Sequence, residues 1–137
     1  MLPISYTFTK AERLCSPKLI SYLFKKPNHS CFCSPIRAIW KLNPTEATTI
    51  PLQILISVPK KQYKKAVDRN YLKRCIREAF RLHKHIVYDT LITNNQSIIL
   101  TCVVQKLVDK PPITYQSIET SMVDILTSIH KHYYISH

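Results

Sequence analysis

Residues 66–81 read AVDRNYLKRCIREAFR, and this stretch separates its cations from its apolar side chains at helical spacing. At about 100° per residue, one arc of roughly 140° holds Arg69, Asn70, Lys73, Arg74, Arg77 and Arg81. A second arc of roughly 100° has the spacing of a packed helix face and holds Leu72, Ile76, Ala79, Phe80 and, just beyond the stretch, His83. The stretch predicts a helix that packs on a core with one side and presents the other side to a polyanion.

The positive charge of the chain is concentrated around this predicted helix. The formal net charge is +12, from 20 Lys and Arg residues against 8 Asp and Glu residues. Ten of these cations lie between Lys60 and Lys84, where Asp68 and Glu78 are the only acids. Such a cluster is typical of proteins that bind a phosphate backbone. A solvated lysine-rich surface is the alternative, and the abundance of arginine and scarcity of acids disfavour it.

Helices and strands are also expected on both sides of this helix. Ser16 and Pro17 are a cap followed by proline at the first helical position, which predicts a short helix over 18–25. Short apolar and β-branched runs predict strands at 36–42, 52–58 and 98–104. The central helix is expected to run from Ala66 to about Ile92. Thr114 is expected to cap a last helix whose inner face carries Ile118, Met122, Ile125, Leu126 and Ile129.

This order of elements predicts an α+β fold, with one sheet layer of about four strands backed by helices. The expected order is α-β-β-(β)-α-β-α, in which the bracketed strand is allowed but has no assigned residues. We expect a single domain over residues 1–137, with an ordered core over residues 10–131.

The chain contains no glycine. Turns that need a positive φ must therefore use asparagine or aspartate, which tolerate the left-handed region better than other residues. Asn28, Asn43, Asn94 and Asn95 fall between the expected elements, and we expect them to serve these turns.

Composition also bears on compartment and chemistry. The five cysteines are odd in number and lack a disulfide framework, which predicts a reducing cytoplasm. Cys31 and Cys33, with His29 nearby, do not have zinc-site spacing and lack a second ligand pair. No segment reaches the roughly 18–20 apolar residues of a membrane span, so no membrane partner is expected. The scarcity of acids argues against a protein-only nuclease that holds metal ions by carboxylates.

The central motif resembles that of a known family. Lys61, Ala66-Val67, Arg69-Asn70, Lys73-Arg74, Arg77-Glu78 and Ala79-Phe80-Arg81 resemble the signature of the bacterial ribonuclease P protein subunit. The N-terminal half is also similar, with Arg13-Leu14, a short helix ending in Phe24 and a strand containing Trp40. The resemblance covers roughly residues 10–131 and implies the ribonuclease P protein fold, which is ribosomal protein S5 domain 2-like.

The resemblance implies an activity as well as a fold. Ribonuclease P removes the 5′ leader of precursor tRNA, and its catalytic RNA subunit performs the cleavage with Mg²⁺. The chain would then be a noncatalytic protein subunit whose partners are the catalytic RNA and precursor tRNA. RNA-binding residues implied by the resemblance are Lys61, Lys64, Lys65, Arg69, Asn70, Lys73, Arg74, Arg77 and Arg81. A cleft for the single-stranded leader would be lined by Ile20, Phe24 and Trp40.

Two departures from the family pattern and three alternatives accompany this interpretation. Tyr71 stands where the family has a second arginine, and we expect it to stack on a base or ribose. The loop before the helix reads Gln62-Tyr63-Lys64-Lys65, without the usual glycine. Ordinary core packing is the alternative for Phe24 and Trp40. For the whole chain, the alternatives are an rRNA-binding ribosomal protein or assembly factor, and a protein-only nuclease.

Overall fold

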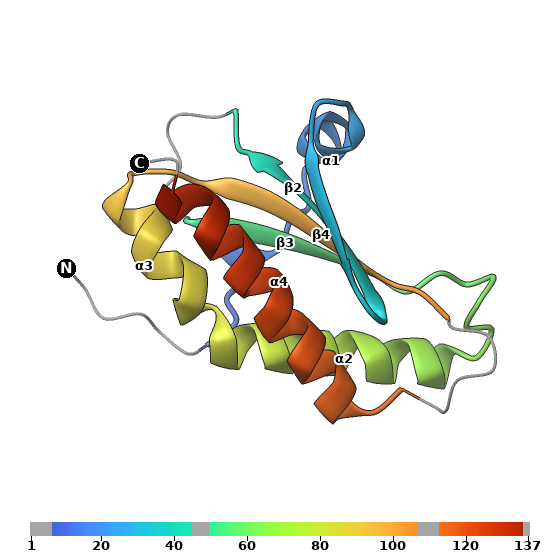
Figure 1. Cartoon of the computed structure of the whole chain (residues 1–137). Helices are drawn as coiled ribbons and strands as arrows, with labels where there is room; N and C mark the ends of the chain where they lie inside the picture. Colours follow the sequence, from blue (N-terminus) through green and yellow to red (C-terminus); the bar gives the residue numbers. More distant parts are fainter. Residues whose placement is uncertain (1–6, 45–49, 107–112, 136–137) are drawn as a thin grey trace.

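The computed structural model describes residues 7–44, 50–106 and 113–135 (Figure 1). A 3₁₀ turn and one short helix precede three strands. Two helices, a fourth strand and a long last helix follow. In chain order the elements are η1 (Lys10–Glu12), α1 (Pro17–Phe24), β1 (His29–Cys33), β2 (Ile36–Leu42), β3 (Leu52–Ser57), α2 (Ala66–His83), α3 (His85–Thr93), β4 (Ile98–Val104) and α4 (Tyr115–Ile135).

The four strands form one mixed sheet in the order β1-β2-β4-β3. The β1–β2 and β2–β4 pairs are antiparallel, with Cys31 opposite Ala38 and Ala38 opposite Cys102. Strands β3 and β4 are parallel, so the chain must cross over between them, and α2 and α3 supply this crossover. The expected α+β sheet is confirmed, but the additional strand, β1, precedes the two predicted strands, whereas the expected order allowed one after them.

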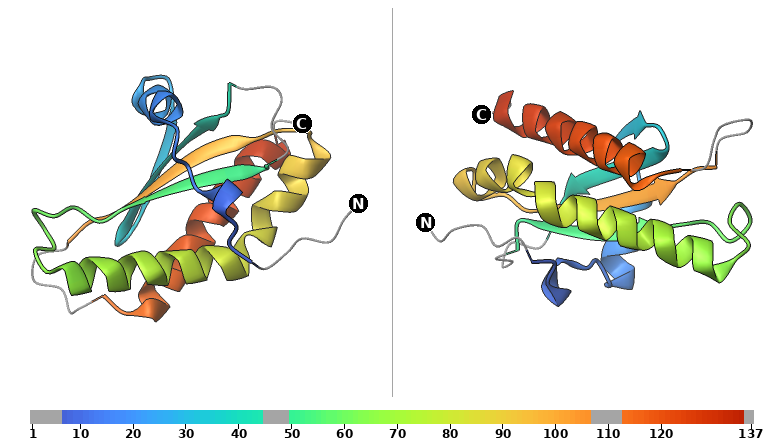
Figure 2. Two further views of the ribbon diagram at one scale, coloured as in Figure 1. Left: turned by 180° about the vertical axis from the view of Figure 1, so that it is seen from behind. Right: turned by 90° about the horizontal axis from the view of Figure 1, so that it is seen from below.

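Helices cover the two faces of the sheet unequally (Figures 1 and 2). Helices α2, α3 and α4 pack on one face, where the main core includes Ala38, Ile54 and Leu100 from the sheet. A smaller core lies on the opposite face, where α1 and the segment before it contribute Leu14 and Leu23 against Ile99 of β4. We call these the helix-covered face and the α1 face.

The expected helix ends and inner faces are confirmed at both ends of the chain. The Ser16 hydroxyl accepts a hydrogen bond of 3.3 Å from the Leu19 backbone N–H, at the start of α1. At the start of α4, the Thr114 hydroxyl accepts one of 3.2 Å from the Ser117 N–H. All five residues expected on the inner face of the last helix are fully buried: Ile118, Met122, Ile125, Leu126 and Ile129.

The expectation of one continuous helix from Ala66 to Ile92 is wrong, because α2 ends at His83 and α3 begins at His85. A straight continuation would rotate Tyr88 about 160° away from Leu72 around the axis. The break turns Tyr88 into the core with Val87. Lys84 lies at the break with its ammonium buried, where it donates to a Glu12 carboxylate oxygen at 2.8 Å.

Fewer asparagines adopt a positive φ than expected. Asn95 has φ of 55° and is the one non-glycine residue with positive φ within the described ranges. The same expectation is wrong for Asn28, Asn43 and Asn94, none of which has a positive φ. Asn94, the C-cap residue of α3, has φ of −81°. Asn28 acts through its side chain, whose amide donates to the Leu23 carbonyl at 3.1 Å after α1. An amide side chain can cap a helix without a left-handed backbone.

The buried Glu12–Lys84 pair predicts an acid-sensitive fold. Burial raises the pKa of Glu12, but hydrogen bonds from Lys84, the Thr9 backbone N–H and Tyr88 more than offset this and hold it below its usual range. The unfolded chain therefore protonates Glu12 at a higher pH than the folded chain does. This contribution to stability is complete at neutral pH and is lost as the pH falls from about 4.3 through the lowered folded pKa.

Urea unfolding between neutral and acid pH checks this expectation. The wild-type midpoint should fall steeply below about pH 4.3. Glu12→Gln cannot lose a charge pair on acidification, so its midpoint should start lower and fall less. Parallel declines in the two proteins would show that other carboxylates cause the acid sensitivity.

Candidate nucleic-acid interface

Helix α2 is amphipathic as expected, with one side in the core and the other in solvent. Its buried residues are Leu72, Cys75, Ile76, Ala79 and Phe80. On the other side Asn70 and Arg74 are exposed, whereas Lys73 and Arg77 are half-buried. Within the described part of the chain, Lys73, Arg74 and Arg77 form no ion pair. We call these three residues the cationic row, and their charge is available to an outside anion.

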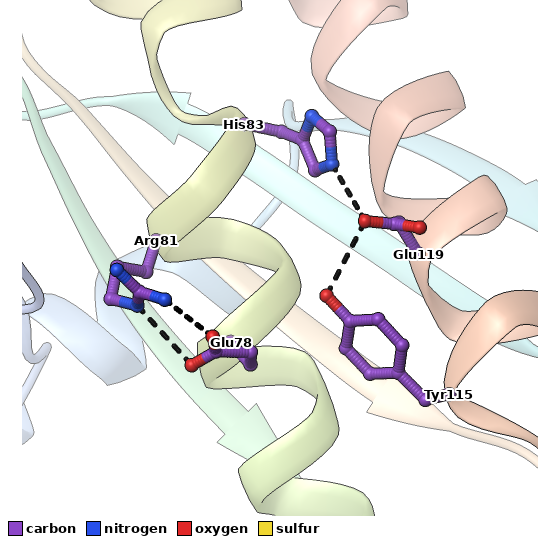
Figure 3. A network of polar contacts seen from close by, with 5 residues as sticks. All are labelled: Glu78, Arg81, His83, Tyr115 and Glu119. Atoms are coloured by element: carbon purple, nitrogen blue, oxygen red, sulfur yellow. Dashed lines mark hydrogen bonds and ion pairs between the residues drawn. The ribbon is translucent and has the colours of Figure 1, made fainter. Parts of the chain in front are cut away.

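Arg81 differs from the cationic row because it has an intramolecular partner (Figure 3). Its guanidinium donates to both carboxylate oxygens of Glu78, one turn earlier on the same helix. This bonding lowers the pKa of Glu78, which keeps the carboxylate charged. Arg81 therefore offers an RNA less net charge than the cationic row does.

A second polar group joins the end of α2 to α4 (Figure 3). A carboxylate oxygen of Glu119 lies 3.0 Å from the His83 ring nitrogen Nε2 and accepts from the Tyr115 hydroxyl at 3.4 Å. His83 thus lies at the edge of the core between two helices. The contact joins α4 to the C-terminal end of α2.

Arg69 stabilises the loop before α2, a role that its position in the motif did not predict. Its guanidinium donates to the carbonyl oxygens of Tyr63 and Lys64, both at 2.9 Å. The backbone N–H groups of Gln62 and Tyr63 donate to the Pro59 carbonyl at 3.2 and 3.0 Å. These bonds give the glycine-free loop a defined path into α2.

The loop lysines gather around one hollow. Lys61, Lys64 and Lys65 are exposed and line a hollow of about 620 Å³ at the start of α2. Tyr71 lines it from the helix, and Lys106 lines it from the end of β4. Lys106 was not among the expected site residues, because it follows a strand more than forty positions after the loop and no local pattern links the two.

The three residues expected to share a leader cleft do not lie together. Phe24 is 50% exposed at the end of α1, and Ile20 is half-buried against the α1 face. Trp40 is only 5% exposed and belongs to the core of the helix-covered face. Its ring stacks on His29 at 5.6 Å and lies 6.3 Å from His132 of α4. Placing Trp40 in that cleft was wrong, because strand alternation directs it to the face opposite α1.

The α1 face carries an exposed aromatic and cation instead. Phe32 of β1 is 47% exposed, and the Arg37 guanidinium lies 5.7 Å from its ring centroid. The two residues are paired in register across β1 and β2. Phe32 and Arg37 could not be predicted from the sequence, because their pairing depends on the register of β1, to which no residues were assigned.

Among the described residues, no group of three or more His, Cys, Asp or Glu side chains is arranged to hold a metal ion. No helix in the same ranges has the length and apolar character needed to cross a membrane.

The family model for Ribonuclease P matches residues 8–128. The chain belongs to this family. The ribonuclease P protein component of Porphyromonas gingivalis is 31% identical over 127 residues, which are 93% of this chain and 89% of that protein. The component of Buchnera aphidicola is 35% identical over 96 residues, which are 69% of this chain and 80% of its relative.

Solved structures of ribonuclease P proteins share the fold. The protein from Thermotoga maritima matches with a TM-score of 0.66 at 20% identity, covering 85% of this chain and 96% of that one. The protein from Staphylococcus aureus matches with a TM-score of 0.66 at 23% identity, covering 90% and 99%. The expected family and fold are therefore confirmed. The chain is a protein component of ribonuclease P, the ribonucleoprotein enzyme of tRNA 5′ processing.

Proposed function

We propose that this ribonuclease P protein binds the catalytic RNA subunit mainly through the cationic row of α2. The observation that carries the proposal is that Lys73, Arg74 and Arg77 have no ion-pair partner among the described residues and lie on a helix whose other side packs in the core. Arginine binds phosphates bidentately and lysine binds them as a point charge, so such a row follows an RNA backbone without reading bases.

The contribution of the protein to cleavage is electrostatic. The RNA subunit holds the catalytic Mg²⁺, and the protein supplies cations where several phosphates converge. Neutralising those phosphates reduces the repulsion between the catalytic RNA, precursor tRNA and the metal ions that the RNA recruits. Stimulation by the protein should therefore be greatest at low Mg²⁺ concentration.

The 5′ leader of precursor tRNA is assigned to the α1 face. Ile20 and Phe24 border this face from α1, and Phe32 and Arg37 lie on it from β1 and β2. Aromatic rings combined with cations bind single strands with little sequence preference. Trp40 has no part in this assignment.

Cleavage of precursor tRNA at low Mg²⁺ by a bacterial ribonuclease P RNA, with and without the protein, tests the proposal. We expect the protein to stimulate cleavage and to cleave nothing by itself. A failure to stimulate RNA from a bacterium with a similar protein component would contradict the proposal and favour rRNA binding. Cleavage by the protein alone would contradict its noncatalytic role.

A further inference from the structure

We propose that the hollow at the start of α2 binds a single unpaired nucleotide of the RNA partner. The hollow measures about 620 Å³ and is lined by Lys61, Tyr63, Lys64, Lys65, Tyr71 and Lys106. This inference rests on the proposed function, since it assumes that the protein binds RNA and specifies which part of that RNA the hollow contacts.

The charge around the hollow favours an anionic ligand. Lys61, Lys64, Lys65 and Lys106 are exposed around it, and among the described residues of its lining Asp68 is the one acid. Within the described ranges these four lysines form no ion pair. No side chain caps the start of α2, so the free N–H groups of its first turn add to the positive potential.

Tyr71 supplies an aromatic surface beside this charge. Its side chain is 46% exposed, although it lies on a helix that buries its neighbour Leu72. The neighbouring Cys75 thiol, one turn later on α2, raises the pKa of Tyr71. Base stacking on an exposed ring, with the phosphate held by cations, is the combination that binds unpaired nucleotides.

Hydrogen bonds connect the described parts of the hollow's lining. Arg69 donates to the carbonyl oxygens of Tyr63 and Lys64, which holds the loop against α2. The Gln62 side chain accepts a hydrogen bond of 2.8 Å from the Lys106 backbone N–H, which joins the loop to the end of β4. A site that is already ordered loses little conformational entropy when a ligand binds.

The size of the hollow favours a nucleotide over smaller anions as its ligand. Its volume lies within the roughly 300–1,000 Å³ of pockets that enclose small organic ligands. A bare phosphate would leave the Tyr71 ring without a contact. A base pair within a continuous duplex cannot present the face of its base to that ring, because both faces are already stacked. An unpaired nucleotide offers both a free base face and a phosphate.

Binding of two RNA probes tests the inference. One probe is a blunt RNA duplex, and the other is the same duplex with one bulged adenosine. The wild-type protein should bind the bulged probe about 10-fold more tightly, since one stacked base contributes about 1–3 kcal/mol. Tyr71→Ala should lose this preference and keep its affinity for the blunt duplex. Tyr71→Phe should keep the preference, because it retains the ring.

Tyr134→Ala is the matched control, since Tyr134 is 67% exposed near the far end of α4. It should bind both probes as the wild type does. Equal wild-type affinity for the two probes, or a preference that survives in folded Tyr71→Ala, would overturn the inference. The proposed function is tested separately by stimulation of cleavage, so a protein that stimulates cleavage without preferring the bulge would remove only the nucleotide site.

Discussion

Replacing Arg74 and Arg77 together by alanine should weaken binding of the ribonuclease P RNA by about 100-fold, because a hydrogen bond to a charged group contributes about 1.5 kcal/mol or more. Both residues lie outside the buried face of α2 and form no ion pair in the described ranges. Their loss should therefore leave the urea unfolding midpoint nearly unchanged. The plot of log affinity against log salt concentration should become less steep by about 2, one for each lost phosphate contact.

A control with the same loss of charge separates this local effect from the general attraction of a basic protein for RNA. Lys10→Ala with Lys131→Ala removes two exposed cations from η1 and α4. This variant should lose far less affinity. Equal losses in the two double variants would show that net charge, rather than the cationic row, governs binding. Arg69 is unsuitable for this test, because its removal also releases the loop carbonyls of Tyr63 and Lys64.

Trp40→Ala should destabilise the fold by about 3–5 kcal/mol, the usual cost of truncating a buried tryptophan. Trp40 is 5% exposed and stacked on His29, with α4 covering it, so its removal leaves a cavity in the main core. Domains of this size are typically stable by about 5–15 kcal/mol, so the variant should be marginally folded or unfolded at moderate temperature. Urea unfolding monitored by far-UV circular dichroism measures the change.

Phe24→Ala is the comparison that distinguishes core packing from leader binding. Phe24 is 50% exposed, so its truncation should change stability little. It should weaken binding of precursor tRNA more than binding of mature tRNA, because only the precursor has a leader to contact the α1 face. A stable Trp40→Ala protein that loses this discrimination would place the leader at Trp40 and contradict the assignment to the α1 face.

Local periodicity was sufficient to predict features that depend on a single helix. The buried side of α2, the Ser16 cap of α1 and the inner face of α4 all follow from residues within a few turns of one another. A helix face or a cap depends on neighbours three or four positions away, and the sequence shows these directly. The family motif lies in such a segment, which is why its cations could be named before the fold was known.

Contacts between distant segments decided what the sequence alone left open. The break after α2 coincides with the pairing of Lys84 and Glu12, which are 72 positions apart. Alternation in β2 predicts that Trp40 shares a face of the sheet with Ala38. It does not predict whether α1 or the other three helices cover that face. Lys106 likewise joins the loop lysines only because β3 and β4 pair in parallel. Sequence thus determined most elements and their amphipathic faces, though not β1 or the break between α2 and α3, since these faces depend on short-range spacing. Tertiary structure decided which faces meet, since that depends on contacts between residues far apart in the chain.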